Sequence, residues 1–492
     1  MLKANDCKLH RQHCPRHTSN DACKMIYRYR NLPRRGLTLI EILIALTMTL
    51  IILGAMAQAF KFASAEIADG RAILEMSNRL RNAQQLLRTD LAGLTVEVKP
   101  HTDTPPNGYL EYVERTAKDS TELGTANGYL GDYDDILAFT SRNLEGTFRG
   151  RRNGEILLST FAEIIWFTEP LDVNSDGNTV DGANTPLYSD TIALHRRVLI
   201  IRPDRNVPLS QTDANGNPLV GLEVVSTEDD VLKFLSNNDI SVRTFELDNG
   251  QFLIAANSLS DLARRENRFA RFPFPIDPVA RSNTFPYFLE PDLLVDTKMV
   301  GPSGFSGNET LMTDVAAFDV QIYSPDSLVA LVDVDNNGVD ETALNRSDIG
   351  FSDFEGTATN NGGFIDLASA GGPFDRAAPD FSTQPVRPTN EPRTNSGVPL
   401  WDAPTLCTWS PHYESDGLDQ NNDGVFDSAT DGLDNDGING VDDAGFGGGG
   451  GERETSPPYL YPARGLKVTF RIIEKKSKQV RQATVVQNFL PQ

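Results

Sequence analysis

An uninterrupted apolar stretch near the N-terminus constrains this chain more than any other feature of its sequence. The stretch runs from Leu37 to Phe60, and Glu41 is its only charged residue. A helix of these 24 residues is about 36 Å long, because each residue adds about 1.5 Å, whereas the hydrocarbon core of a membrane is about 30 Å thick. We therefore predict one membrane-spanning helix here.

The position of Glu41 is unusual for a simple membrane anchor. A carboxylate inside a bilayer costs about 2.5 to 3.5 kcal/mol, so an intramembrane carboxylate indicates a function. If the chain is cut after Gly36, Leu37 gains an α-ammonium group one helical turn from Glu41. A cation about 4 Å away stabilises a carboxylate by about 4 kcal/mol at an effective dielectric constant of 20, and the helix dipole adds to this. Such an amine would offset the cost of burying Glu41.

The segment 36–41, GLTLIE, resembles the cleavage signal of type IV pilins and the related pseudopilins. The resemblance implies that a prepilin peptidase cuts between Gly36 and Leu37 on the cytoplasmic side and that Leu37 is then N-methylated. Members of the family usually begin with Phe, where this chain would begin with Leu37. The resemblance also implies that Glu41 sets subunit register by pairing with the N-terminal amine of a neighbouring subunit. The alternative is that Glu41 pairs with the N-terminal amine of its own chain.

The distribution of charge predicts the orientation of the chain in a membrane. Residues 1–36 contain nine basic and two acidic residues, a local charge of +7 that should remain cytoplasmic. The rest of the chain holds 36 basic and 66 acidic residues, a formal charge of −30, which argues against nucleic-acid binding. We expect a single-pass protein of the inner (cytoplasmic) membrane, with its N-terminus cytoplasmic and its C-terminal domain periplasmic, as in the family.

The same helix is predicted to continue beyond the membrane. Apolar residues recur at intervals close to a helical repeat from Ile67 to Leu94, while Asp90 and other charged residues fall on different faces. Gly93 and Pro100 end the pattern. One helix over residues 37–94 is therefore expected, with its second half packed on a folded domain.

Short β-type segments separated by Gly, Asn, Asp and Pro follow the helix. They predict an α+β fold, in which the long helix packs on one or two antiparallel sheets. The expected strands are Asp135–Thr140, Glu155–Thr168, Thr191–Ile201, Gly221–Val225, Asp314–Tyr323, Leu328–Val332, Gly465–Glu474 and Val480–Phe489.

The order of five segments narrows the resemblance to the J-type minor pseudopilin of type II secretion systems. These segments are 79–91, 163–167, 194–197, 315–323 and 462–470. The resemblance implies a pilin-like fold and a non-enzymatic subunit at the tip of a periplasmic pseudopilus, which helps to initiate assembly with other major and minor pseudopilins. Two alternatives remain: a minor pilin of a type IV pilus, and a calcium-dependent adhesin or binding module carried on a pilin stalk.

The chain is about twice as long as members of that family, which predicts insertions in the pseudopilin domain. The second insertion is acidic, rich in Gly, Asn, Asp and Pro, and poor in apolar runs. The expected division is a leader at 1–36, a transmembrane half-helix at 37–60, an amphipathic half-helix at 61–94, a β domain from 95–201, 311–332 and 461–492, an insertion or small subdomain at 202–310, and the acidic insertion at 333–460.

Three acidic loops have the spacing of calcium-binding loops, with oxygen-bearing side chains at positions 1, 3 and 5 and Gly at position 6. The twelfth position is not Glu in any of them, so further ligands are needed, and hydrated Asn/Asp turns without metal are the alternative. The candidate ligands are Asp172, Asn174 and Asp176, then Asp333, Asp335 and Asn337, then Asp419, Asn421, Asp423, Asp427, Asp434 and Asp436.

Nothing in the sequence predicts catalysis. The histidines beyond the leader, His101, His195 and His412, form no pair with metal-ligand spacing, and no nucleophile-elbow or phosphate-binding motif occurs. His195 precedes two arginines on an expected strand and is predicted to be a surface or interface residue. The sequence therefore favours a structural protein over an enzyme.

Overall fold

The computed structural model divides into two compact units, Met1–Ile67 and Ala68–Gln492. It describes residues 38–99, 107–114, 131–171, 191–213, 215–271, 308–325, 327–333, 342–345, 351, 355–360, 362–367, 405–408, 410–418, 425–427, 430–434, 440–442, 462–474 and 479–489.

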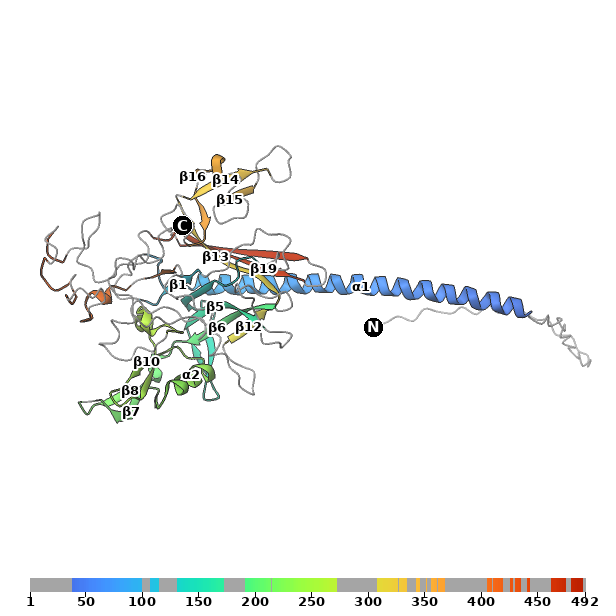
Figure 1. Cartoon of the computed structure of the whole chain (residues 1–492). Coiled ribbons are helices and arrows are strands. Elements are labelled where there is room, and N and C mark those ends of the chain that lie inside the picture. The colour runs from blue at the N-terminus through green and yellow to red at the C-terminus, as the bar shows by residue number, and fades with distance from the viewer. Residues whose placement is uncertain are drawn as a thin grey trace, which may run out of the picture. The chain divides into compact units, whose positions relative to one another are not determined.

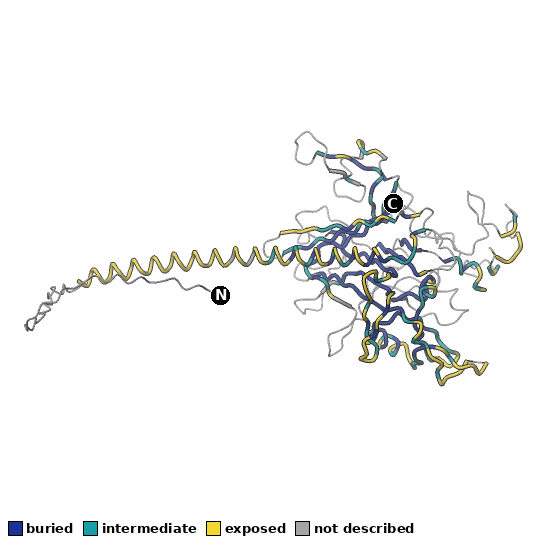
Figure 2. The backbone as a smooth tube through the Cα atoms, turned by 180° about the vertical axis from the view of Figure 1, so that it is seen from behind, coloured by how far each residue is buried: buried dark blue, intermediate teal, exposed yellow. Residues whose placement is uncertain are grey.

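A single helix, α1, extends over Leu39–Ala92, close to the expected 37–94. Within the first unit its side chains from Leu39 to Ser64 are exposed (Figure 2). Within the second unit one face of α1 becomes buried at intervals of three and four residues, the spacing of a helical face. The buried apolar residues of this face are Met76, Leu80, Ala83, Leu87 and Leu91.

A six-stranded antiparallel sheet forms the centre of the second unit. Its strands lie in the order β12-β6-β5-β2-β1-β18, and Figure 1 labels four of them, β1, β5, β6 and β12. The edge strand β18 comes from the acidic insertion and pairs with β1. The bounds are β1 Leu110–Val113, β2 Ile136–Arg142, β5 Phe161–Leu171, β6 Thr191–Ile200, β12 Asn308–Met312 and β18 Thr405–Cys407.

A four-stranded antiparallel sheet lies beside α1 and the first sheet, in the order β17-β13-β19-β20. Aromatic rings join the two sheets: Trp166 of β5 lies 6.0 Å from Phe470 of β19, which lies 5.7 Å from Phe318 of β13. One apolar core thus contains the buried face of α1 and one face of each sheet. The bounds are β13 Val315–Ser324, β17 Gly363–Ile365, β19 Gly465–Ile473 and β20 Val480–Asn488.

The first insertion covers the opposite face of the six-stranded sheet. A second core joins Ile165 and Phe167 of β5 to Val231 and Phe234 of helix α2 and Ile254 of β11. The elements involved are β3 Phe148–Arg152, β4 Glu155–Ser159, β7 Val207–Thr212, β8 Pro218–Gly221, β9 Glu223–Val225, α2 Glu228–Asn237, β10 Val242–Glu246, β11 Phe252–Ala256 and α3 Leu259–Leu262.

A smaller three-stranded sheet, β15-β14-β16, belongs to the acidic insertion. Its strands are β14 Leu328–Val332, β15 Thr342–Asn345 and β16 Thr359–Asn360. Short 3₁₀ turns lie at Pro203–Arg205, Arg265–Asn267, Glu355–Thr357 and Pro411–Glu414.

The expectation of an α+β fold with a long N-terminal helix and antiparallel sheets is confirmed. Two expected strands differ: Glu155–Thr168 is two strands interrupted at Thr160, and Gly221–Val225 joins the end of β8 to β9. The expectation that Asp90 lies on a polar face of the helix is wrong, because Asp90 is only 2% exposed and pairs with Arg196 on β6.

Candidate functional site

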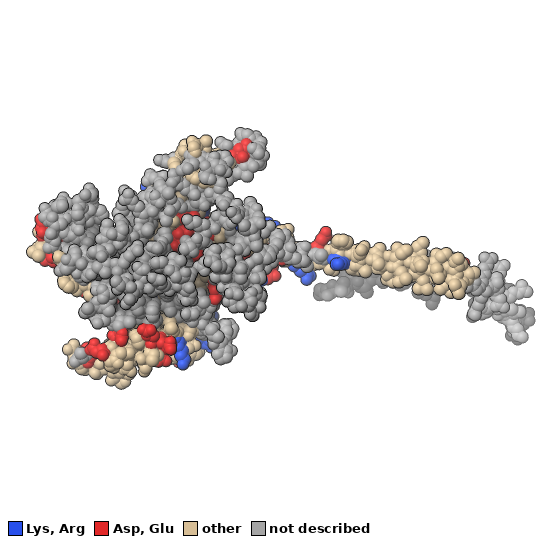
Figure 3. Space-filling view, viewed as in Figure 1, with Lys and Arg blue, Asp and Glu red and all other residues tan. Residues whose placement is uncertain are grey.

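The N-terminal part of α1 presents an exposed apolar surface. Residues Leu39–Ser64 are long and apolar enough to span a membrane, and none of this segment is buried within the protein. Figure 3 shows that this part of the helix is almost free of charged atoms. Its length and composition therefore fit a single membrane-spanning segment.

Thr38 and Glu41 cap the first turn of α1. The Thr38 backbone N–H and hydroxyl donate to Glu41 Oε2 at 2.8 and 2.9 Å, and the Glu41 N–H donates to Thr38 Oγ1 at 3.3 Å. This reciprocal arrangement is a capping box, which satisfies backbone N–H groups that the helix leaves unpaired. The Thr-x-x-Glu spacing in the sequence is its signal. Gly36 and Leu37 lie outside the described residues, so the predicted cleavage site and amine do too.

A buried carboxylate cluster, formed by Glu114, Asp132 and Asp135, lies at one end of the six-stranded sheet. One oxygen atom from each residue lies within 4.8 Å of the others, and all three side chains are buried. The Tyr112 hydroxyl donates a hydrogen bond to Glu114, and the Val320 N–H donates to Asp135 Oδ2 at 2.7 Å. Such a set of hard oxygen atoms could hold a divalent cation.

Burial and mutual repulsion strongly favour the protonated forms of this cluster. Burial and the charges of Glu114, Asp134 and Asp319 raise the pKa of Asp132 to about 12. Burial and neighbouring carboxylates also raise the pKa of Glu114 and of Asp135 well above their usual values. Buried carboxylates this close must bind protons or another cation to relieve their repulsion.

The sequence interpretation missed this cluster because its members are separated along the chain. The available signal was the run Asp132-Tyr133-Asp134-Asp135, in which three carboxylates directly precede an apolar strand. Carboxylates at such a position are normally expected in a solvated turn.

The structure describes only part of the predicted calcium loops. Nine of the twelve predicted ligands lie outside the described residues, namely Asp172, Asn174, Asp176, Asp335, Asn337, Asp419, Asn421, Asp423 and Asp436; Asp333, Asp427 and Asp434 lie within them.

Around the described residues of these loops, one hydrogen-bonding arrangement occurs twice. The Asp427 carboxylate accepts from the Gly417 N–H at 2.9 Å, and the Asp442 carboxylate accepts from the Gly432 N–H at 2.9 Å. Two successive loops of the acidic insertion therefore share this hydrogen bond, with the donor and the acceptor ten residues apart in both.

The prediction that His195 lies at the surface is wrong. His195 is 4% exposed because β12 pairs with β6 and covers it; the register places Thr310 opposite His195. The imidazole stacks on Phe167 with ring centroids 5.2 Å apart, and its Nε2 lies 3.2 Å from Glu169 Oε2. Burial lowers the pKa of His195 to about 4. β12 is a short strand that the sequence pattern did not predict.

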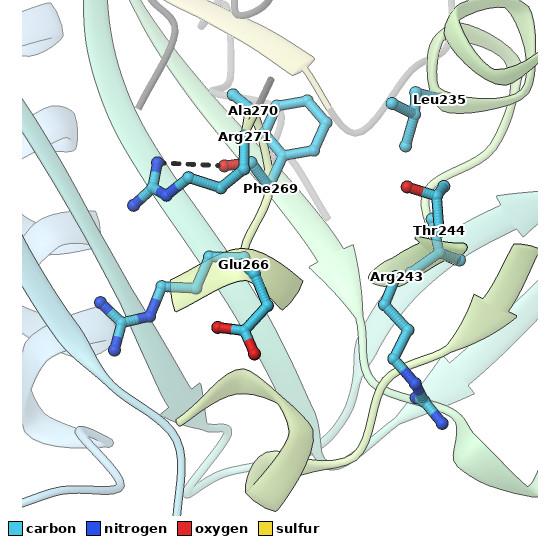
Figure 4. Close-up of a pocket in the computed structure, with 9 residues that line it drawn as sticks. Leu235, Arg243, Thr244, Glu266, Phe269, Ala270 and Arg271 are labelled. Carbon is cyan, nitrogen blue, oxygen red and sulfur yellow. Dashed lines mark hydrogen bonds between the residues drawn. The ribbon is translucent and has the colours of Figure 1, made fainter. Parts of the chain in front are cut away.

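A small pocket lies between β10 and the segment 266–271 (Figure 4). Two of its arginines, Arg268 and Arg271, already bind the buried Glu111, as does Arg265 nearby. Their charges hold the first insertion against β1. The pocket therefore offers stabilising ion pairs rather than free groups for substrate chemistry.

Comparisons of the chain with models of protein families, with curated proteins and with solved structures gave no match.

Proposed function

We propose that this chain is a structural subunit of a pilin-type filament, and specifically a J-type minor pseudopilin of a type II secretion system. A prepilin peptidase removes residues 1–36 and N-methylates Leu37. The apolar part of α1 then holds the chain in the inner membrane until it joins a bundle of equivalent helices from other pseudopilins at the tip of a periplasmic pseudopilus.

The observation that carries this proposal is the division of α1 into two chemically different parts. From Leu39 to Ser64 the helix is apolar on every side and exposed. From Met76 to Leu91 the same helix buries one face in the core of a β domain. A helix of this kind provides a lipid-soluble segment in the same helix as a face that packs on a folded domain, which is what a helical filament subunit requires.

Glu41 can act in two ways, as a helix cap and as a charge, and a substitution can separate the two. Its carboxylate closes the first turn together with Thr38, and in the proposed filament it also attracts the N-terminal amine of a neighbouring subunit. Glutamine can replace glutamate in a capping box but carries no charge. Glu41→Gln therefore removes the electrostatic attraction and retains the cap.

The test compares three variants of the whole chain, coexpressed with its prepilin peptidase and partner pseudopilins. We expect Glu41→Gln and Glu41→Ala to insert and be cleaved normally but to lose cross-links to the partner subunits, whereas Thr38→Ala, which removes only the cap, keeps them. Cleavage is measured by mass spectrometry and insertion by alkaline extraction. Normal cross-linking of Glu41→Gln would exclude the register function, and a native chain that cross-links to no pseudopilin would refute the proposed function.

One observation favours the adhesin or binding-module alternative for the acidic insertion. The repeated loop arrangement at Gly417–Asp427 and Gly432–Asp442 resembles a built recognition element rather than a featureless linker. Deletion of residues 410–445 separates the two functions. A filament subunit should still cross-link to its partners after the deletion, and a binding module should lose adhesion while assembly is unchanged.

A further inference from the structure

Strand register brings the carboxylate cluster together. β1 and β2 are antiparallel neighbours, and Val113 is paired with Ile136. Glu114 directly follows β1 and Asp135 directly precedes β2, so these two residues are neighbours at the same end of the strand pair. Asp132 lies three residues before Asp135 in the chain. The cluster therefore depends on the sheet and is independent of the acidic loops at 416–442.

Strand β13 of the four-stranded sheet closes another side of the cluster. The Phe318 N–H donates to the Asp132 carbonyl oxygen at 2.9 Å, and the Val320 N–H donates to Asp135 Oδ2 at 2.7 Å. Between these two residues lies Asp319, whose charge acts on all three members of the cluster. The cluster thus lies where the two sheets meet.

The separations of the oxygen atoms fit a calcium ion. Calcium binds oxygen at about 2.3 to 2.6 Å, so ligands on opposite sides of one ion are about 5 Å apart. The three carboxylate oxygens lie within 4.8 Å of one another and can therefore contact a single ion. Magnesium keeps several bound waters and is seldom held in a cage of protein groups, which makes it a poorer fit to three buried carboxylates.

Two buried oxygens provide an independent indication of a cation. Among the described residues, Asp135 Oδ1 and Gln321 Oε1 have no hydrogen-bond donor, although Asp135 is 0% and Gln321 3% exposed. Gln321 lies two positions after Asp319 on β13, and therefore on the same face of that strand. Asp135 Oδ1 needs a proton or a cation as its partner, whereas Gln321 Oε1, an amide oxygen, cannot be satisfied by taking up a proton.

We propose that Glu114, Asp132 and Asp135 bind one calcium ion, which joins β1 and the segment before β2 to β13 and so fastens the six-stranded sheet to the four-stranded sheet. The proposal is independent of filament assembly, because every residue involved lies in the β domain.

The test is a calcium titration of the whole chain in detergent after removal of metal with a chelator. Equilibrium dialysis with ⁴⁵Ca should show one site that Asp132→Asn and Asp135→Asn each weaken at least tenfold. The matched control Asp229→Asn changes an exposed carboxylate in the first turn of α2, outside the predicted calcium loops, and should leave this site unchanged. Calcium should raise the thermal midpoint of the native chain, and the two cluster variants should lose this increase.

Without metal, the cluster variants should behave differently. An amide is close in size to the carboxyl group that it replaces and adds no charge, so Asp132→Asn and Asp135→Asn should melt close to the temperature of the calcium-free native chain. A native chain that binds no calcium, or cluster variants that bind it unchanged, would overturn the proposal.

If either variant fails to fold, hydrogen exchange of the native chain provides the decisive measurement. Calcium should then slow exchange at 131–136 and 318–322. Protection confined to 416–442 would place the ion in the acidic loops and refute the proposed site.

Discussion

Asp90 of α1 and Arg196 of β6 form a buried, two-point ion pair between the long helix and the six-stranded sheet. Arg196 Nε donates to Asp90 Oδ2 and Nη2 donates to Oδ1, each at 2.7 Å. Trp166 Nε1 donates to the same Oδ2 at 3.1 Å. Since the guanidinium and carboxylate planes must match for two such bonds, this contact fixes the rotation of the last helical turn as well as its position.

Asp90→Ala should destabilise the β domain strongly. The substitution leaves the Arg196 guanidinium buried without its main partner, and breaking a buried pair in this way costs about 3 to 5 kcal/mol. The free energy of unfolding can be measured by urea denaturation of the detergent-solubilised chain, followed by tryptophan fluorescence. Glu75→Ala breaks an exposed pair with Arg79 on the same helix and should cost less than about 1 kcal/mol. Equal losses for the two variants would contradict the structural importance of Asp90.

Gly93→Ala and Gly70→Ala should change stability in opposite directions. A Cβ atom at Gly93 would lie 2.0 Å from the Arg142 carbonyl oxygen, whereas at Gly70 nothing lies within 4 Å. Alanine at Gly93 should therefore cost about 1 to 3 kcal/mol through overpacking. At Gly70, inside α1, it should stabilise by about 0.5 to 1 kcal/mol because alanine favours the helix. Thermal denaturation of both variants tests this, and stabilisation by Gly93→Ala would show that the helix end is not held against β2.

The ion pairs of Glu111 predict a loss of stability in acid. Burial by itself raises the pKa of Glu111, but the charges of Arg271, Arg265 and Arg268 outweigh it and lower the pKa well below its ordinary value of 4.5. Because the folded state has the lower pKa, the stabilisation is complete above about pH 4.5 and is lost as the pH falls through the folded-state pKa.

Glu111→Gln isolates this contribution. At pH 7 the variant leaves three buried guanidinium groups uncompensated and should be about 3 to 5 kcal/mol less stable than the native chain. The difference between the two should shrink as the pH falls below 4.5, because the Glu111 carboxylate of the unfolded chain then takes up a proton while that of the folded chain remains ionised, which favours unfolding of the native chain. Urea denaturation between pH 3 and pH 7 measures this difference in the free energy of unfolding. A difference that does not vary with pH would exclude the predicted dependence of stability on the ionisation of Glu111.

Gly36→Val should prevent removal of the leader. A β-branched side chain at the cut position blocks close approach of the backbone to a protease, so we expect the uncut chain to accumulate in the membrane. Immunoblotting against a C-terminal tag, with mass determination, distinguishes the two forms. Gly54→Val, within the same apolar stretch, is the matched control and should be cleaved normally. Processing of Gly36→Val at the same bond would show that the cleavage site is wrong.

The long helix and most central strands were predictable because their signals are local. Helical periodicity predicted α1 within two residues at either end, and Leu328–Val332 coincides with β14. In short strands such as β1, β12 and β18, the alternation of apolar and polar residues is too short to be recognised. These strands form because neighbouring strands of the same sheet offer unpaired backbone groups, and the local sequence contains no signal for that.

The candidate sites follow the same division. Glu41 was recognised from its sequence context, although its Thr38 partner in the cap was overlooked. His195 and Asp90 were expected near solvent, because neither the covering strand β12 nor the partner Arg196 on β6 lies close to them in sequence. The carboxylate cluster combines residues 114, 132 and 135 with a strand almost two hundred residues later.

The sequence by itself determined the apolar helix and the acidic character of the domain that follows, since length, periodicity and charge are properties of neighbouring residues. Only the tertiary structure decided which charges are buried. Asp90, Glu111 and the three clustered carboxylates lie in segments that read as ordinary polar surface, and they become buried because strands distant in sequence cover them. Burial removes the water that would otherwise solvate a charge, so the environment of each carboxylate is a property of the assembled sheets and not of its local sequence.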